Sequence, residues 1–521
     1  MQHSTSPRKP TRFIRALAIT AVAAISLTAC AATGSGSSSG DVEQVLTYGI
    51  NGAVPVLHAG QTQGNVGITV NALIHRGLLS YDADGQIIAG LAEEWEVVDP
   101  STYRFTLREG LTFQDGSPVT SANVKNSLEY YTTADSGANA IFQQISDIEV
   151  DGDLGVTISL SANNSSFISY LALADTAIVP DSALDPEAVN DIGAGPFELT
   201  EQTEGVSTIF TKFDGYYGAD DVELEQVEAV YYTDGAARVN ALLSGDVDLI
   251  DYVPWESFSQ VEDDPALTLD AQVGPFLMAL FNTTSGPFAE AKVREAVAFA
   301  INRENIVETV LLGNGQPTYG VIVPEGGEYD TADATAMYEY DPEHAKELLA
   351  EAGYPDGFSV NISTSSQHAF LQDTAISMQS DLAAIGVELT FDGSDFASLV
   401  EKLNNGTYDL AVSGGVGAVT DPSWLTRFVG GAPSFEHSYG YSNADLTNAL
   451  ETGNSSGDAD EVRASFDDAF MIIKEDVPML FLAQRAQGYA FSNGVEGFSN
   501  IPGFTTNQSG VTIADVHMVA G

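Results

Sequence analysis

The sequence predicts an α/β protein that is long enough to form more than one hydrophobic core. Beyond residue 41, extended segments rich in β-branched and aromatic residues alternate with segments of helical periodicity. No unit of about 20 to 50 residues repeats along the chain, which argues against solenoids and propellers. With 521 residues, the chain exceeds the size at which a single core usually stops growing. We therefore expect several α/β units.

The N-terminal segment has the charge order of an export signal. Its first fifteen residues include four basic residues and no acid, and an apolar stretch follows at 16–29. This stretch is too short to span a bilayer permanently, and no later run reaches ~18 uninterrupted apolar residues. The chain is therefore not expected to be a permease.

The apolar stretch ends in Leu-Thr-Ala before Cys30, the only cysteine in the sequence. This pattern fits a bacterial lipobox, in which the cysteine is diacylated and becomes the new N-terminus. We expect residues 1–29 to be a signal peptide and residues 30–40, rich in Gly and Ser, to be a flexible linker. The mature protein would be held at the outer face of the cell membrane by lipid alone. An ordinary cleaved signal with a chance cysteine is the alternative.

Composition excludes several functional classes. The chain carries 73 acidic residues against 19 Lys plus Arg, so nucleic acid and anionic lipid are poor ligands. The excess charge fits a solvated acidic surface better than a site for cations. A lone cysteine excludes a disulfide framework, and stability must come from a core.

The sequence offers no hydrolase motif in the context that its chemistry needs. HExxH is absent, SxxK occurs only at 6–9 in the expected signal peptide, and GxSxG occurs only at 36–40 in the Gly/Ser-rich linker and at 453–457, in neither case after a predicted strand. We therefore expect no catalytic residues. The seven histidines have neither HxH nor HxxxH spacing, so no metal site or other cofactor is expected.

Strands are predicted where β-formers alternate or cluster between turn residues. The clearest are 45–50 (VLTYGI), 103–107 (YRFTL) and 387–391 (VELTF). The sequence Asp-Ala-Asp-Gly at 82–85 superficially resembles a calcium loop. Its glycine comes too early and no glutamate closes the loop, so we interpret it as a hairpin turn.

Helices are predicted from apolar periodicity and terminal signals. One begins after Asp341 as N-cap, with Pro342 in its first turn, and ends at Gly353. A second begins at about Glu290, and a further helix begins near Asn302. Another predicted helix has an apolar face of Met378, Leu382 and Ile385. A glycine ends it, and the strand at 387–391 follows directly.

Several motifs occur in one collinear series from residue 78 to residue 422. They are LLSYD at 78–82, LAEEWEV at 91–97, YRFTLREG at 103–110, FQDGSPVTSANV at 113–124, GAGPF at 193–197, ALLSGDVD at 241–248, GPF at 286–288, VREA at 293–296, AINR at 300–303 and YDL at 408–410 before DP at 421–422. This series resembles the peptide/nickel-type solute-binding proteins, that is, the dipeptide- and oligopeptide-binding proteins of solute-binding family 5 in ABC importers. We interpret most motif residues as structural: Trp95, Tyr103 and Phe105 as core aromatics, and Arg108 and Arg294 as buried ion-pair partners.

The resemblance implies a two-lobed, type II periplasmic-binding-protein-like α/β fold with hinge strands. An inserted subdomain is expected in the first lobe. The implied boundaries are 41–72, 193–275 and 487–521 for lobe I, 73–192 for the insertion, and 276–486 for lobe II. A solute bound between the lobes would close them by hinge bending and present the closed form to the permease.

The resemblance also implies where a solute binds. Dipeptide receptors of this kind place an aspartate, which pairs with the peptide ammonium group, in the loop after the late strand. Ala418 occupies that position here, which weakens a simple dipeptide assignment. The substrate-binding candidates are Asn51, Trp255, Gln367, Gly417, Ala418, Val419, Thr420 and Asp421.

These considerations predict a monomeric receptor for a small peptide or related solute that delivers it to an ABC permease and ATPase complex. Asp421 is the alternative carboxylate, although an aspartate before a proline is more often a turn residue. An oligosaccharide, an opine or chelated nickel remain alternative solutes. A surface sensor or adhesin on the same fold is the alternative class.

Overall fold

The computed structural model describes residues 42–61, 64–133, 140–164, 166–324, 326–416, 419, 421–429 and 436–520. Residues Val42–Gly521 cluster as one compact unit. Cys30 and the candidates Gly417, Ala418 and Thr420 lie outside the described residues. Within the described part of the chain, no helix is both long and apolar enough to cross a bilayer.

One sheet of eleven strands contributes to both lobes. Its order is β15-β14-β16-β12-β17-β11-β1-β10-β9-β8, and β13 also pairs with β17. The strands are β1 (Val45–Ile50), β8 (Phe197–Thr203), β9 (Ser207–Lys212), β10 (Gln226–Tyr231), β11 (Leu249–Ile250), β12 (Leu267–Phe281), β13 (Gly315–Pro317), β14 (Phe358–Ser365), β15 (Val387–Ser394), β16 (Leu410–Gly415) and β17 (Met479–Ser492). The first lobe is defined here by β1 and β8–β11, and the second lobe by β14–β16.

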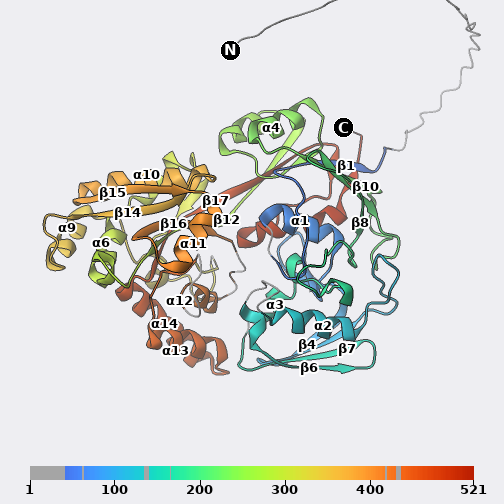
Figure 1. Ribbon diagram of the computed structural model, residues 1–521, viewed down its shortest axis with the longest axis horizontal. Coiled ribbons are helices and arrows are strands. Elements are labelled where there is room, and N and C mark those ends of the chain that lie inside the picture. Colours follow the sequence, from blue (N-terminus) through green and yellow to red (C-terminus); the bar gives the residue numbers. More distant parts are fainter. Residues whose placement is uncertain are drawn as a thin grey trace, which may run out of the picture. The chain divides into compact units, whose positions relative to one another are not determined.

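Strands β12 and β17 form a long antiparallel ladder, called the hinge ribbon below (Figure 1). At one end β17 pairs with β11 of the first lobe, and at the other β12 pairs with β16 of the second. The register shifts between Val273 and Phe276, where the chain reads Gly-Pro. Proline has no N–H to give to a ladder, which accounts for the irregularity at this step. The step lies between the part of the ribbon that pairs with the first lobe and the part that pairs with the second.

Helices cover the two halves of the sheet. Those of the first lobe are α1 (Gly64–Ile74), α4 (Gly235–Ser244), α5 (Phe258–Glu262), and the 3-10 segments η4 (Trp255–Ser257) and η7 (Gly503–Asp515). Those of the second are η5 (Pro287–Ala289), α6 (Ala291–Ala300), α7 (Arg303–Thr309), α8 (Ala332–Thr335), α9 (Pro342–Glu351), α10 (Ala369–Ala384), α11 (Phe396–Asn405), η6 (Pro422–Leu425), α12 (Thr426–Val429), α13 (Ala444–Ser455) and α14 (Ala459–Asp476).

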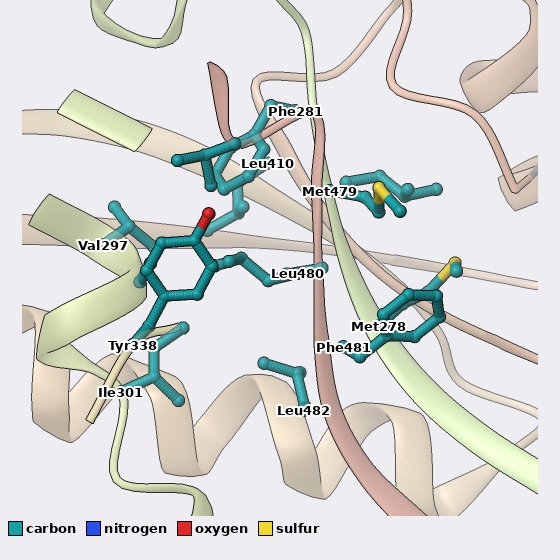
Figure 2. Close-up of a cluster of buried hydrophobic side chains, with 14 of the residues drawn as sticks. Met278, Phe281, Val297, Ile301, Tyr338, Leu410, Met479, Leu480, Phe481 and Leu482 are labelled. Atoms are coloured by element: carbon teal, nitrogen blue, oxygen red, sulfur yellow. The ribbon is translucent and has the colours of Figure 1, made fainter. Parts of the chain in front are cut away.

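The second lobe has the larger apolar core, shown in part in Figure 2. There Met278 and Phe281 of β12 lie with 479–482 of β17 and with Val297 of α6. Burial of these fully enclosed side chains stabilises the lobe by about 1.5–3 kcal/mol each. The same packing fixes the second-lobe end of the hinge ribbon.

A separate four-stranded sheet is built from the segment between α1 and β8. Its order is β4-β5-β7-β6, with β4 (Ala92–Asp99), β5 (Thr102–Leu107), β6 (Ile145–Asp151) and β7 (Gly155–Leu160). Helices α2 (Ser121–Tyr131) and α3 (Phe167–Tyr170), the segments η1 (Ala140–Gln144), η2 (Ala174–Thr176) and η3 (Asp181–Ala183), and the hairpin of β2 (Leu79–Tyr81) and β3 (Ile87–Ala89) complete it. A short pair, β18 (Val495–Glu496) and β19 (His517–Met518), lies near the C-terminus.

The chain enters and leaves this segment side by side. The Nε2 atom of His75 lies 3.1 Å from the carbonyl oxygen of Asn190, and Gly195 N–H donates to the Ile74 carbonyl. The side chain of Gln114 joins both crossings, since its amide donates to Ile74 and its oxygen accepts from Gly193. Neutral hydrogen bonds therefore define the junction, while the exact domain boundaries remain a prediction.

The structure confirms the predicted elements. Strand β1 spans 45–50, and Asp341 caps α9 by accepting the N–H of His344 at 3.0 Å. Asn302 caps α7 in the same way. Tyr103 and Phe105 are buried as core aromatics.

The predicted ion pairs of Arg108 and Arg294 are wrong. Arg108 donates to the Gly90 carbonyl, and its guanidinium lies over the ring of Tyr217. Arg294 donates to the carbonyls of Phe288, Asp476 and Val477. Carbonyls at the ends of secondary-structure elements take the place of carboxylates, because the last turns leave acceptors unsatisfied.

Candidate functional site

A cavity of about 920 Å³, called the large cavity, lies along one part of the hinge ribbon. Its walls come from the β2–β3 hairpin, from η7, from 316–324 after α7 and from Val273 and Gln484 of the ribbon. The volume is within the usual range for small-molecule sites. The cavity is therefore large enough for a solute, and its walls come from elements of both lobes, as a solute-binding cleft requires.

The described lining of the large cavity contains no Lys, Arg or His. Its charged side chains are Asp84 and Asp330. The other polar groups are carboxamides and hydroxyls: Tyr81, Gln86, Ser169, Gln316, Thr318, Tyr319, Thr335, Gln484 and Thr505. Such a surface can exchange hydrogen bonds with neutral amides and can attract an ammonium group, but it offers no cation to a carboxylate.

Thr318 is the clearest open hydrogen-bonding group in this lining. It is 6% exposed, and its hydroxyl has no hydrogen-bond partner. Its own N–H donates to the Leu482 carbonyl of the hinge ribbon, so its position is fixed. A buried hydroxyl without a partner costs free energy that a ligand can recover.

The predicted hairpin turn at 82–85 is confirmed and is part of this cavity. Asp82 accepts the N–H groups of Asp84 and Gln86, and Gly85 adopts the left-handed conformation with φ 75°. These bonds fix the turn, which presents Asp84 and Gln86 to the cavity. A segment interpreted only as a turn thus supplies a cavity wall.

A second cavity of about 420 Å³, called the hinge pocket, lies along another part of the ribbon. It is lined by residues 252–256 after β11, by the end of α7, by the first turn of α10 and by 485–488 of β17. Successive side chains of a strand point to opposite faces. Accordingly, Gln484 lines the large cavity and Arg485 lines the hinge pocket.

A buried arginine fixes the first-lobe wall of the hinge pocket. Arg238 of α4 donates to the carbonyls of Tyr232, Asp251 and Tyr252, and its Nε lies 3.4 Å from the Asp251 carboxylate. Burial raises the pKa of Asp251 to about 7, while the nearby guanidinium lowers it. Tyr252 has φ 45°, a strained conformation for a bulky residue, and these bonds hold it in place.

Trp255 bridges the two lobes at the hinge pocket. Its indole Nε1 donates to the carbonyl of Ala486 at 2.9 Å, and its ring centroid lies 6.1 Å from that of Phe370 in α10. Burial and the charge of Arg485 lower the pKa of the nearby His368. This aromatic contact makes Trp255 a natural reporter of lobe movement.

The structure places the described candidates, Asn51, Trp255, Gln367, Val419 and Asp421, in different surroundings. Val419 lines the large cavity and Trp255 the hinge pocket. Asn51 follows β1 and Gln367 follows β14, where its side chain accepts the N–H of Phe396 at the start of α11. Asp421 caps η6 through the N–H of Ser423 at 2.8 Å, the turn role considered from the sequence. These assignments to solute binding remain predictions.

Sequence reasoning missed Arg485, Gln484 and Thr318. Arg485 stands in a strand whose other residues are mostly apolar, MLFLAQRAQGYAFS. In a chain so poor in Lys and Arg, a lone arginine inside an apolar strand was the available signal. Across the described residues, no group of three or more His, Cys, Asp or Glu could hold a metal ion.

The hinge ribbon and its flanking lobes define a type II periplasmic binding protein. The model of the bacterial extracellular solute-binding proteins, family 5, matches residues 86–435. The chain belongs to this family, and its members are the substrate-binding components of ABC transporters, not enzymes.

Curated relatives and solved structures agree with this assignment. The glutathione-binding protein GsiB of Salmonella typhimurium is 29% identical over 447 residues, which cover 82% of this chain and 86% of the relative. The binding protein AgaA of A. tumefaciens R10, solved with agropinic acid, is 37% identical with a TM-score of 0.83, over 92% of this chain and 99% of that one. A dipeptide-binding protein of Pseudoalteromonas sp. SM9913, solved with Met-Leu, shares the fold at 22% identity, with a TM-score of 0.77 over 91% of this chain and all of that one.

Proposed function

We propose that this protein captures a peptide-like solute in the large cavity and delivers it to the permease of an ABC importer. The observation that carries the proposal is the lining of that cavity. Carboxamides of Gln316 and Gln484 and the hydroxyl of Thr318 can donate to and accept from peptide groups. The carboxylates of Asp84 and Asp330 can pair with an ammonium group.

Binding is proposed to close the lobes by bending the hinge ribbon at its irregular Gly-Pro step. A solute that contacts both walls favours the closed form by its extra contacts there, and the permease would recognise that form. The same mechanism predicts that Trp255, which joins the lobes, changes its fluorescence on closure.

Titration of the full chain with di- to pentapeptides tests the substrate class. We expect tryptophan fluorescence to change with some peptides, and calorimetry to give one site per chain. Blocking the amino group by acetylation should weaken binding about tenfold or more, because a desolvated carboxylate loses its charge partner. A flat response to peptides together with a response to oligosaccharides would overturn the proposed class.

An opine is the second candidate solute. It is favoured by the 37% identity over nearly the full length with a protein solved with agropinic acid. Competition decides between the two classes: agropinic acid should displace a bound peptide if both use one cavity. Mass spectrometry of any solute that co-purifies with the protein is the direct measurement.

We further propose that the protein is monomeric and is anchored through Cys30 at the outer face of the membrane. Replacing Cys30 by alanine should move it from the membrane fraction to the soluble fraction. A Cys30→Ala protein that still sediments with membranes after a salt wash would contradict the lipid anchor. Ser37→Ala in the adjacent linker is the matched control.

A further inference from the structure

The hinge pocket contains a cation that the structure does not neutralise. No carboxylate lies within ion-pair distance of Arg485 in the described part of the chain, although Glu256 and Asp373 line the same pocket. Buried Arg238 lies beside Asp251, and buried Arg303 donates to carbonyls, although its Nη2 has no partner. Among the described residues, Arg485 has neither a carboxylate nor a carbonyl as partner, which distinguishes it from these arginines.

The surroundings of Arg485 hold it in position but leave its charge uncompensated. Its Cζ lies 5.0 Å from the centroid of the Phe370 ring, which orients the planar guanidinium. Burial lowers the pKa of Arg485, and the opposing influence comes from Tyr252, a neutral phenol. A partly desolvated guanidinium gains most from an oxyanion that accepts two N–H bonds.

Two further features of the pocket favour an anion. Gln487 is 2% exposed and near the hydroxyls of Tyr252 and Tyr489, yet neither amide atom makes a well-aligned hydrogen bond. Helix α10 begins at Ala369 without a side-chain cap, and its first turn lines the pocket. Amide donors and the positive end of a sixteen-residue helix thus converge near Arg485.

We propose that the hinge pocket binds the carboxylate of a small zwitterion through Arg485. Glu256 and Asp373 on its walls disfavour a dianion and match an ammonium group. Because Gln484 and Arg485 point to opposite faces of the ribbon, the zwitterion is an amino acid or peptide separate from the solute of the large cavity. It binds where the lobes meet and would influence closure.

Three matched probes test the charge requirement: glycylglycine, its C-terminal amide and its N-acetyl derivative. Calorimetric titration of the full chain should rank glycylglycine first and the amide last. Arg485→Gln should weaken glycylglycine about tenfold or more, and Arg485→Lys should restore part of the loss. Arg463→Gln, which breaks an exposed pair with Glu328, is the control and should change nothing.

Equal binding of the acid and the amide, no binding of glycylglycine in the millimolar range, or an undiminished affinity in Arg485→Gln would each overturn the proposal. Thr318→Val, in the large cavity, tests whether the two pockets bind separately. Glycylglycine binding should be unchanged in this variant, and this result stands even if no peptide enters the large cavity. A loss of glycylglycine affinity as large as that in Arg485→Gln would overturn the assignment to the hinge pocket.

Discussion

The large cavity and the hinge pocket lie along the same ribbon but are built with opposite chemistry. The described lining of the large cavity has two carboxylates and no cation, whereas the hinge pocket has Arg485 and rests on the buried pair of Arg238 and Asp251. The junction between the four-stranded segment and the first lobe is instead held by hydrogen bonds of neutral side chains, those of His75 and Gln114. Arg485 and Arg238 are thus the cations that distinguish the hinge pocket from the large cavity.

This difference implies that the two regions respond differently to mutation and to pH. A wall held by buried charge is damaged most by removing one partner, because the other is left without compensation. A junction held by a buried neutral histidine is instead sensitive to acid, since protonation must occur without solvent.

The largest effect is expected from Arg238→Met in the hinge region. Three carbonyls lose their donor and Asp251 loses its charge partner, so the free energy of unfolding should fall by about 3 to 5 kcal/mol. Urea denaturation measures the change. Arg104→Met removes an exposed pair with Glu96, with side chains 55% and 63% exposed, and should cost less than about 1 kcal/mol. Equal losses in the two variants would contradict the contrast.

The next effect is a pH dependence at the junction between the four-stranded segment and the first lobe. Burial lowers the pKa of His75 from 6.5 to about 4, with a smaller contribution from Arg76, while its bond to Asn190 opposes the shift. A lowered pKa in the folded state means that stability is present above pH 6.5 and is lost as pH falls towards 4. His75 should therefore cost about 3 kcal/mol at pH 4 relative to pH 7.

Denaturation of His75→Gln and of the natural sequence at both pH values measures this effect. Glutamine keeps a donor for the Asn190 carbonyl but does not titrate, so its stability relative to the natural protein should rise as pH falls. His344→Gln, the same substitution in the exposed first turn of α9, is the matched control. Parallel pH profiles for His75→Gln and the natural protein would contradict the lowered pKa, because His75 would then take up a proton as readily in the folded chain as in the unfolded one.

Most of the fold could be predicted because local signals fixed it. Asp341 and Asn302 cap the helices that their positions indicated, and the alternation at 45–50 became β1. These features depend on residues within one or two turns of each other. The collinear family motifs then supplied the arrangement of lobes, which no local pattern contains.

The site was less predictable because it depends on residues distant in sequence. Tyr252 and Arg485 share a pocket only because β11 pairs with β17, and a strand arginine in isolation looks like a solvent-facing residue. Likewise, Arg108 and Arg294 were expected to pair with carboxylates. The carbonyls that they bind lie at the ends of secondary-structure elements, and only the folded chain brings these ends close to the two arginines. Most of the motif residues support the fold, whereas most residues that line the two cavities lie outside the motifs.

The smallest effect is expected from Thr318→Val in the large cavity, where no buried charge is at stake. Valine keeps the shape and removes a hydroxyl that has no partner, so the free energy of unfolding should stay level or rise by about 1 kcal/mol. Solute affinity should nevertheless fall about three- to tenfold, the net worth of one neutral hydrogen bond. Calorimetry with a peptide that binds measures it, and Thr268→Val, on the exposed start of β12, is the control. A loss of stability together with unchanged affinity would show that the hydroxyl supports the fold, and the large cavity would then lose its best-defined contact to a solute.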